Sequence, residues 1–422
     1  MHRLSFVVFI LVLLLFASSC QSSQYLLDTR FDTGEFLEDY DVSMDYTASQ
    51  GMLTRAGDVY YANMGNLAVY HDIQTGVTGA LCGKADCAHD SMNCNAFLDL
   101  GGANIQVYDG KLYWLQMNPT GWSLYRMGLD GSGRELVQDI TDPESYDLQF
   151  AIHRGYVYTM TIKSDVSGGS SSRILEIKQY VLGAQEEEPY TIYTQAYDGS
   201  LQYVYALYRN KLYMAVDNDK NFEGRSYDRE LFEYDVAARE WKLLWSDTLP
   251  WTAMAMVVDA AGADILETQS TEAYKIQKSR IIFSTGQREE MGEISTIEGV
   301  SADSRQSVFM SEEYIVIYTC AYPGADPRSQ DVYRCRVLDK STCEVLAEHE
   351  MSGEYVYCIG SDENGILFNQ ESWEAEHLSD TEDLTAYKIL LVPSVQNQEP
   401  YYPMEYDEVL SIGKSTWQAI FP

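Results

Sequence analysis

Three cysteines and a histidine gather in one short segment, in the pattern Cys82-x4-Cys87-x-His89-x4-Cys94. Outside the cytoplasm disulfides are the default fate of cysteines, and one disulfide with a leftover thiol accounts for these residues. The alternative is a structural Zn²⁺ site, because thiolates and an imidazole close in sequence can surround a tetrahedral ion. The spacing departs from the usual zinc knuckle, which has two residues between paired cysteines. Zn²⁺ is the one cofactor that the sequence suggests. Either a disulfide or a zinc ion would have a structural role and would stabilise the loop.

Four later cysteines lie within one stretch of the chain: Cys320, Cys335, Cys343 and Cys358. We expect Cys320 and Cys335 on the two arms of one hairpin, and Cys343 and Cys358 on the arms of another. Cross-strand pairing would then give two disulfides. Reduced thiols in the core are the alternative, since free cysteine is a common buried residue.

Cys20 ends a segment that has the order of an export signal. Arg3 supplies a positive start, residues 4–16 are apolar except for Ser5, and small residues lead to Cys20. The apolar run is shorter than the ~20 residues of a stable spanning helix. The small residues before the cysteine resemble the lipobox of bacterial lipoproteins, in which the cysteine is acylated after cleavage. This resemblance implies a signal peptide over residues 1–19 and a lipidated tether over residues 20–30.

Recognisable catalytic motifs are missing from the sequence. The six histidines are scattered, and there is no H-E-x-x-H, no G-x-S-x-G, no phosphate loop and no dinucleotide fingerprint. The sequence therefore favours a binding protein over an enzyme.

A short turn followed by a strand recurs along the chain at intervals of roughly 50 residues, slightly above the ~40–50 typical of propeller blades. Gly110-Lys111-Leu112-Tyr113-Trp114 is the clearest copy. Taking one residue of each strand as an anchor, the seven copies are Tyr61, Tyr113, Tyr158, Tyr213, Ile265, Val316 and Phe368.

Further strands with period-2 alternation follow each copy, bounded by turn residues, as half-buried antiparallel strands require. Such a unit cannot bury both of its faces alone, but a radial arrangement buries the faces between neighbours. We therefore predict an all-β chain with a single β-propeller domain over residues 31–422. It would have about seven four-stranded blades, although six or eight are compatible with the pattern. Residues 409–421 are expected to supply a closing strand to the first blade.

Charge is strongly unbalanced. The chain has 64 Asp and Glu residues against 29 Lys and Arg, for a net charge of −35. Such a chain repels nucleic acid and anionic lipid head groups, so a nucleic-acid partner is excluded as a class. The segment that begins at Asp217 echoes a calcium loop but lacks the glycine and glutamate that the loop requires, so we expect a polar hairpin loop there.

One blade resembles the low-density-lipoprotein-receptor-type propeller, in the run from Leu124 to Val137 (LYRMGLDGSGRELV). Tyr113-Trp114 stands where the Tyr-Trp-Thr-Asp tetrad of that family begins, but the tetrad is not kept. The signal, the cysteine loop and the blades together are also similar to uncharacterised propeller lipoproteins of gut Firmicutes. These resemblances imply a fold and a location, and no activity.

The expected function is that of a binding or scaffolding lipoprotein on the outer face of the bacterial cytoplasmic membrane. The lipid would attach it to the membrane, and a loop-lined face bearing Trp122 and Tyr125 would engage a protein, peptide or glycan. A cell-envelope enzyme, such as a glycan lyase or hydrolase, and a small-molecule capture lipoprotein are the alternatives. The fold cannot choose among the three, because propellers host many functions.

Overall fold

The structure is a computed structural model of the chain. It describes residues 29–37, 40, 53–64, 67–72, 74–75, 77–84, 87, 89, 93–98, 104–118, 121–140, 148–165, 172–184, 188–220, 226–269, 275–294, 305–310, 314–321, 332–352, 356–362, 365–372, 385–393, 409–412 and 417–420. Within these ranges, no helix has the length and apolar character needed to cross a membrane. Cys20, the signal segment and the start of the tether lie outside the described residues.

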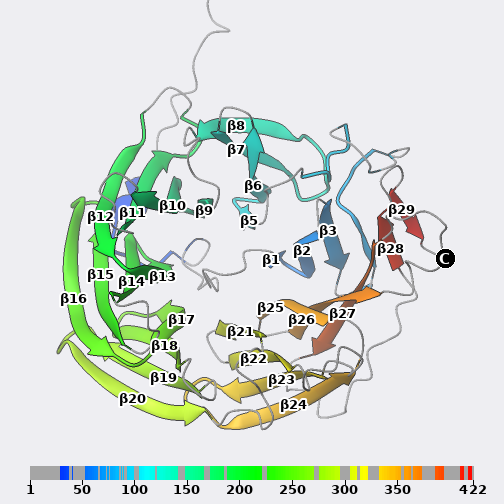
Figure 1. Cartoon of the computed structure of the whole chain (residues 1–422). Helices are drawn as coiled ribbons and strands as arrows, with labels where there is room; N and C mark the ends of the chain where they lie inside the picture. The colour runs from blue at the N-terminus through cyan, green and yellow to red at the C-terminus, as the bar shows by residue number, and fades with distance from the viewer. Residues whose placement is uncertain are drawn as a thin grey trace, which may run out of the picture.

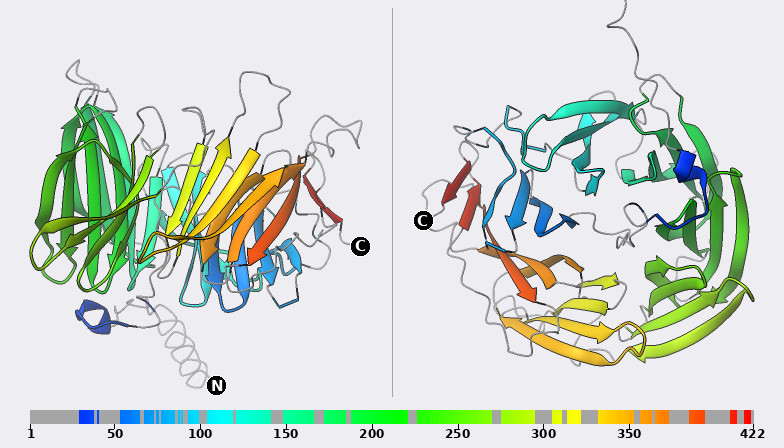
Figure 2. Two further views of the ribbon diagram at one scale, coloured as in Figure 1. Left: turned by 90° about the horizontal axis from the view of Figure 1, so that it is seen from below. Right: turned by 180° about the vertical axis from the view of Figure 1, so that it is seen from behind.

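Seven antiparallel sheets stand side by side in a ring, which confirms the predicted β-propeller (Figure 1). In the described part of the chain, six sheets have four strands and one has five, and each is built from consecutive strands. We number them blade one to blade seven in chain order. The first strand of each blade lies nearest the centre of the ring and the fourth lies at its rim (Figures 1 and 2).

The first four blades run from Leu53 to Leu249. A short 3-10 turn, η1 (Thr29–Asp32), precedes them. Their strands are β1 (Leu53–Ala56), β2 (Val59–Met64), β3 (Leu67–Asp72) and β4 (Thr78–Ala80); β5 (Ile105–Tyr108), β6 (Lys111–Asn118), β7 (Gly121–Gly128) and β8 (Glu135–Ile140); β9 (Leu148–His153), β10 (Tyr156–Asp165), β11 (Ser172–Val181) and β12 (Tyr190–Asp198); and β13 (Ser200–Tyr208), β14 (Lys211–Asp219), β15 (Tyr227–Asp235) and β16 (Glu240–Leu249).

The last three blades complete the ring. Their strands are β17 (Thr252–Val258), β18 (Gly262–Gln269), β19 (Lys275–Ile282) and β20 (Gln287–Ile294); β21 (Arg305–Met310), β22 (Tyr314–Ala321), β23 (Val332–Asp339) and β24 (Val345–Ser352); and β25 (Val356–Asp362), β26 (Gly365–Ser372), β27 (Thr385–Pro393), β28 (Val409–Ile412) and β29 (Trp417–Ile420). The expectation of a closing strand for the first blade is wrong. β28 pairs with β27 and β29 pairs with β28, so the end of the chain widens blade seven instead.

All seven anchor residues lie in the second strand of a blade, from Tyr61 in β2 to Phe368 in β26. The recurring turn before each anchor joins the first and second strands. In blade two it consists of Asp109 and Gly110, with φ values of 46° and 68°. Positive φ at both central residues gives the twist that suits a two-residue hairpin, which is why this turn is easy to recognise in the sequence.

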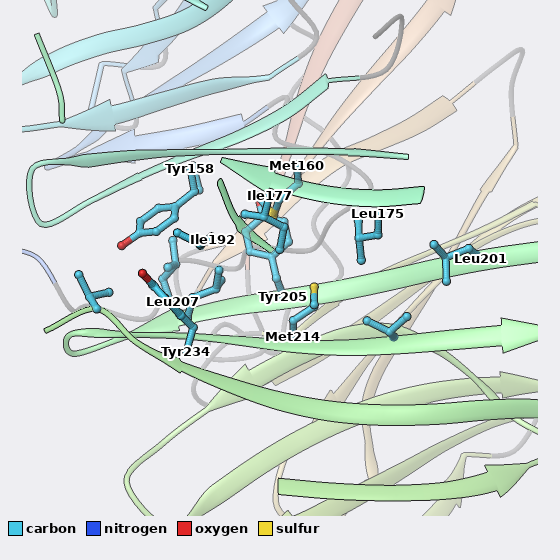
Figure 3. Packing of buried hydrophobic residues seen from close by; sticks show 14 of the residues in the cluster. Tyr158, Met160, Leu175, Ile177, Ile192, Leu201, Tyr205, Leu207, Met214 and Tyr234 are labelled. Atoms are coloured by element: carbon cyan, nitrogen blue, oxygen red, sulfur yellow. The ribbon is translucent and has the colours of Figure 1, made fainter. Parts of the chain in front are cut away.

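The hydrophobic core lies between the blades. One cluster joins Tyr158, Met160 and Leu175 of blade three to residues such as Tyr205 and Met214 of blade four (Figure 3). Similar clusters link blades one and two, two and three, four and five, and five and six. At these five junctions neighbouring blades therefore bury their faces against one another, as the repeat pattern predicts.

Candidate functional site

The cysteine loop interrupts the outermost strand of blade one. β4 pairs with β3 as far as Ala80, and the backbone O of Ala68 in β3 then accepts a hydrogen bond from the N–H of Leu81, at 2.8 Å. The N–H of the same Ala68 donates to the O of Ala96, also at 2.8 Å, and Phe97 forms an antiparallel bridge with Leu67. The outer strand is thus made in two halves, and the loop that carries the cysteines leaves and rejoins the blade between them.

Cys82, Cys87, His89 and Cys94 converge in this loop. Their ligand atoms all lie within 4.8 Å of one another, and His89 Nδ1 lies 3.2 Å from Cys94 Sγ. The three cysteines are free thiols, and Cys94 is buried. The structure therefore brings together all four residues that the sequence singled out here, with one donor atom of each directed to a common centre.

Two of the thiols accept backbone hydrogen bonds. Burial disfavours the Cys82 thiolate, but the N–H groups of Lys84 and Asn95 and the neighbouring thiols outweigh burial and lower the pKa of Cys82. Burial, reinforced by the neighbouring thiols, raises the pKa of Cys94 to about 12, although the N–H of Ala96 donates to it. N–H groups directed at sulfur stabilise a thiolate, which is the form that binds metals.

The loop also rests on blade two, at the turn between β7 and β8. Asn95 Nδ2 donates to the backbone O of Gly131 at 2.7 Å. Arg134 donates to the backbone O of Cys94 at 3.1 Å and to that of Phe97, and its guanidinium lies over the rings of Trp114 and Tyr125. One charged residue of blade two thus holds the rejoining end of the loop.

The later cysteines lie in two different blades. Cys320 in β22 faces Tyr333 across the strand pair, so Cys335 in β23 is its diagonal neighbour and not its direct partner. Cys343 is a free thiol in the turn before β24, and Cys358 belongs to β25 of blade seven. The expectation that Cys343 and Cys358 share one hairpin is therefore wrong, because the boundary between blades six and seven falls between them.

The two aromatic residues expected on a binding face belong to the interior. Trp122 is 4% exposed and packs in the cluster between blades two and three. Tyr125 is partly buried, and its ring stacks on Trp114 with ring centroids 5.8 Å apart. The assignment of Trp122 to a ligand-binding surface is therefore wrong, since its indole fills the space between blades.

The segment before the first blade packs against one face of the ring (Figure 2). Arg154 donates to three of its backbone oxygens, those of Phe31, Thr33 and Glu35, at 3.2, 2.7 and 2.6 Å. Arg209 donates to the O of Gly34 at 3.3 Å. Both arginines sit in the turns between first and second strands, so we call this the turn face.

The opposite end of the second strands forms the loop face. It carries a cavity of about 450 Å³ between blades three and four, whose lining includes Asp198, Lys220, Asp228, Glu230 and Asp247. Lys220 Nζ pairs with Asp228 Oδ2 at 2.5 Å at the rim. Carboxylates outnumber cations in this lining, so the cavity favours a cationic or hydrogen-bonding ligand.

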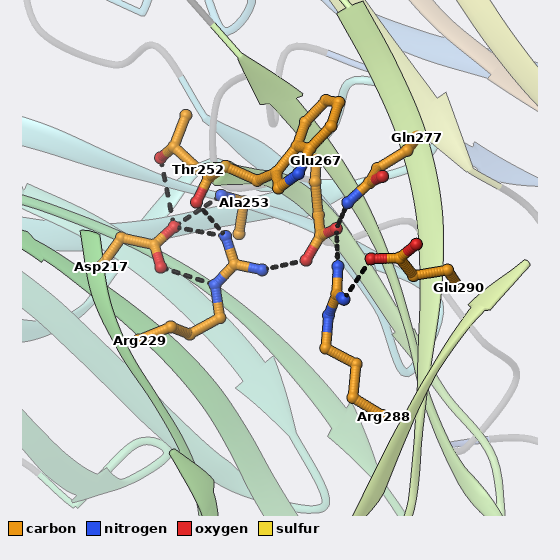
Figure 4. A network of polar contacts seen from close by, with 9 residues as sticks. Asp217, Arg229, Thr252, Ala253, Glu267, Gln277, Arg288 and Glu290 are labelled. Atoms are coloured by element: carbon orange, nitrogen blue, oxygen red, sulfur yellow. Dashed lines mark hydrogen bonds and ion pairs between the residues drawn. The ribbon is translucent and has the colours of Figure 1, made fainter. Parts of the chain in front are cut away.

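Asp217, which opened the calcium-like segment, is buried between blades four and five (Figure 4). Arg229 donates to both of its carboxylate oxygens, at 2.6 and 2.9 Å, and also to Glu267. Glu267 in turn accepts hydrogen bonds from Gln277 and Arg288, each at 2.6 Å. Asp217 is thus a buried partner of arginine within β14, so the expectation that the polar hairpin loop begins at Asp217 is wrong: the strand continues to Asp219.

Several residues that build these sites gave little signal in the sequence. Arg134 stands in the turn that resembles a receptor-type blade, but nothing in its surroundings indicates that it reaches the cysteine loop. Arg154 and Arg209 each occupy a hairpin turn with positive φ, where glycine, asparagine or aspartate is usual. An arginine in such a turn is the signal that could have indicated a docking role.

Comparisons with known proteins agree on the fold. No protein-family profile matches the sequence, and no curated protein is detectably similar to it. Among solved structures, a prolyl endopeptidase matches 96% of this chain with a TM-score of 0.50 and 10% identity. This chain spans about half of that enzyme, 54% of its length.

Two further matches are weaker. The β-propeller domain of the Trilobed protease from Pyrococcus furiosus matches 90% of this chain and 98% of its own, with a TM-score of 0.45 and 7% identity. A nidogen–laminin complex, which includes a low-density-lipoprotein-receptor-type propeller, matches 69% of this chain and 92% of its own, with a TM-score of 0.39 and 10% identity. At these identities the similarity extends to the β-propeller fold alone.

Proposed function

We propose that this protein is a lipid-anchored binding module of the bacterial cell envelope, whose loop face recognises a protein or peptide with basic side chains. The observation that carries the proposal is the separation of the two faces. The segment that follows the tether packs on the turn face through Arg154 and Arg209, and the acidic cavity lies at the other end of the same blades.

The length of the tether supports this orientation. Eight residues lie between Cys20 and Thr29, and an extended chain over these nine peptide steps spans about 30 Å. A lipid on Cys20 would therefore keep the turn face near the membrane and direct the loop face outward. The excess of carboxylates in the cavity and the net charge of −35 favour a cationic partner, because complementary charge increases association rates.

The anchor is tested by Cys20→Ala in a bacterial host. Mass spectrometry of the wild-type amino terminus is expected to find an acylated cysteine, and the variant is expected to leave the membrane fraction. A wild-type protein with an unmodified Cys20 that is found outside the membrane fraction would contradict the lipid anchor. The proposed binding function would not depend on that result.

Binding is tested by thermal unfolding of the full chain in detergent, against lysine- and arginine-rich peptides and neutral glycans. A ligand at ~100 times its dissociation constant adds about 2.7 kcal/mol, which a thermal scan detects. We expect stabilisation by the basic peptides, and its loss in the double variant Glu230→Gln, Asp247→Asn.

The matched control is Glu293→Gln, which removes an exposed carboxylate from β20 of blade five and should leave binding unchanged. Stabilisation by a glycan alone, or a peptide effect that the double variant retains, would contradict the proposed cavity. Binding to the glycan would then favour the envelope-enzyme alternative, and the next measurement would be release of products from that glycan.

A further inference from the structure

We propose that Cys82, Cys87, His89 and Cys94 bind one Zn²⁺ ion, which holds together the two halves of the outermost strand of blade one. The site is independent of the proposed binding function, because it lies at the rim of the ring and away from the cavity of the loop face. It is a structural metal site, and its ligand set is drawn entirely from one loop.

The distances fit a tetrahedral ion. With Zn–S bonds of about 2.3 Å, the ligand atoms of a tetrahedral site are ~3.8 Å apart. The four donor atoms lie within 4.8 Å of one another, and His89 Nδ1 is 3.2 Å from Cys94 Sγ. The shortest separation and this upper limit therefore lie on either side of the separation expected for a tetrahedral site.

The backbone of the loop is arranged for this convergence. His89 has a φ of 57°, a left-handed conformation that is uncommon outside glycine, and its ring nitrogen lies beside the thiols. The N–H of Lys84 is directed at the sulfur of Cys82, and the N–H of Ala96 at that of Cys94. Both bonds come from the residue two positions after the cysteine, so the loop supplies thiolate-stabilising donors at its departure and at its return.

A disulfide explains fewer of these observations. It would join two sulfurs and leave the third thiol outside the bond, although all three thiols and the imidazole of His89 lie together. A cation at the common centre uses all four groups. A coordinating thiol is deprotonated by the metal, and the positive charge of the ion offsets the repulsion between the resulting thiolates.

Four protein ligands complete the coordination of zinc, which leaves no open position for a substrate or a water. A bound ion would therefore stabilise the loop and would not take part in catalysis. Cys82 directly follows the first half of the outer strand, and Cys94 lies two residues before Ala96 in the second half. An ion that joins them fixes the loop where it contacts Gly131 and Arg134 of blade two.

The first experiment measures metal and thiols in the full chain purified in detergent. We expect one zinc per chain by elemental mass spectrometry. Replacement by Co²⁺ should give the visible absorption of a tetrahedral thiolate complex, and removal by a chelator should lower the melting temperature by several degrees. Zn²⁺, but not Ca²⁺, should restore the melting temperature.

Variants assign the ligands. Cys87→Ser and His89→Ala are expected to lose most of the bound metal, whereas His89→Cys should retain it with a changed Co²⁺ spectrum. Cys343→Ser is the matched control, because this free thiol lies outside the loop and its loss should leave one zinc per chain.

Three results would overturn the proposal, and the first two are measured on the wild-type chain. One is a native mass that shows two of the loop thiols oxidised and no metal. Another is a reduced protein that remains free of metal after incubation with Zn²⁺ and dialysis. The third is zinc that stays bound in both His89→Ala and Cys87→Ser.

Discussion

Two junctions between blades are held in different ways. Between blades four and five, the buried Arg229 pairs with Asp217 and Glu267, so permanent charges from both blades neutralise one another inside the core (Figure 4). Between blades one and two, the outer strand is broken, and Arg134 with the cysteine loop connects its two halves to the neighbouring blade. Both junctions also contain a hydrophobic cluster.

The two junctions hold neighbouring blades together by different physical means. A closed network of ionised side chains acts without a cofactor, but every member depends on its partners because a buried charge cannot be left unpaired. A loop of soft ligands depends on the metal or redox state of its surroundings. We therefore expect loss of one side chain to destabilise the junction between blades four and five. The junction between blades one and two should be weakened both by substitutions and by removal of the metal with a chelator.

The largest effect is expected from Arg229→Met. Removal of the guanidinium leaves Asp217 and Glu267 buried without their main counter-charge, which should reduce the free energy of unfolding by about 3–5 kcal/mol. Denaturant titration of the full chain measures it. Lys275→Met is the control, since the pair with Glu293 is exposed and worth about 0–1 kcal/mol. Equal effects of the two substitutions would mean that the network does not hold the junction.

A second substitution tests how closely the cysteine loop is seated on blade two. Gly131 has a φ of 74°, and a Cβ there would lie 2.6 Å from the backbone C and O of Leu81. We expect Gly131→Ala to cost about 2–4 kcal/mol, the sum of a left-handed conformation and overpacking. Gly133→Ala has a similar φ but no atom within 4 Å, so it should cost only the conformational part. Thermal unfolding measures the loss of stability in both variants. Equal losses would contradict the close contact between Gly131 and Leu81.

Arg134→Met isolates the contribution of the arginine to the junction between blades one and two. Loss of its hydrogen bonds to the backbone O of Cys94 and Phe97 should cost about 1.5–3 kcal/mol. The control in the same blade is Arg126→Met, whose ion pair with Glu135 is partly exposed and is worth about 0–1 kcal/mol. If the junction depends on the loop, the chelator effect on the melting temperature should also become smaller in Arg134→Met than in Arg126→Met.

The smallest effect concerns pH. Burial lowers the pKa of His71 in β3, and nearby Asp72 only partly opposes this. A group with a lowered pKa in the folded state stabilises the fold above its unfolded pKa, about 6.5 for histidine, and this stability is lost as the pH falls through the folded value. Blade one should therefore weaken below about pH 6.5, and His71→Asn should flatten this part of the pH profile of unfolding. A profile unchanged by the substitution would exclude His71 as its source.

Much of the fold could be predicted because the signals are local. Each turn before an anchor such as Tyr113 or Tyr213 is readable from a few adjacent residues, and the alternation that follows it identifies the strands. The boundary between blades six and seven was harder to predict from the sequence. Cys343 and Cys358 are close in sequence, and the pattern between them does not mark where one sheet ends.

The sequence alone determined the type and order of the strands, the approximate number of blades, the acidic surface and the composition of the cysteine loop. These follow from residue types and from spacings of a few positions. Only the tertiary structure decided that Trp122 is buried, that Asp217 faces Arg229 and Arg209 meets Gly34, and that His89 reaches the three thiols. The reason is physical: each blade is completed by its neighbour, so the environment of a side chain depends on a surface that its own segment does not encode.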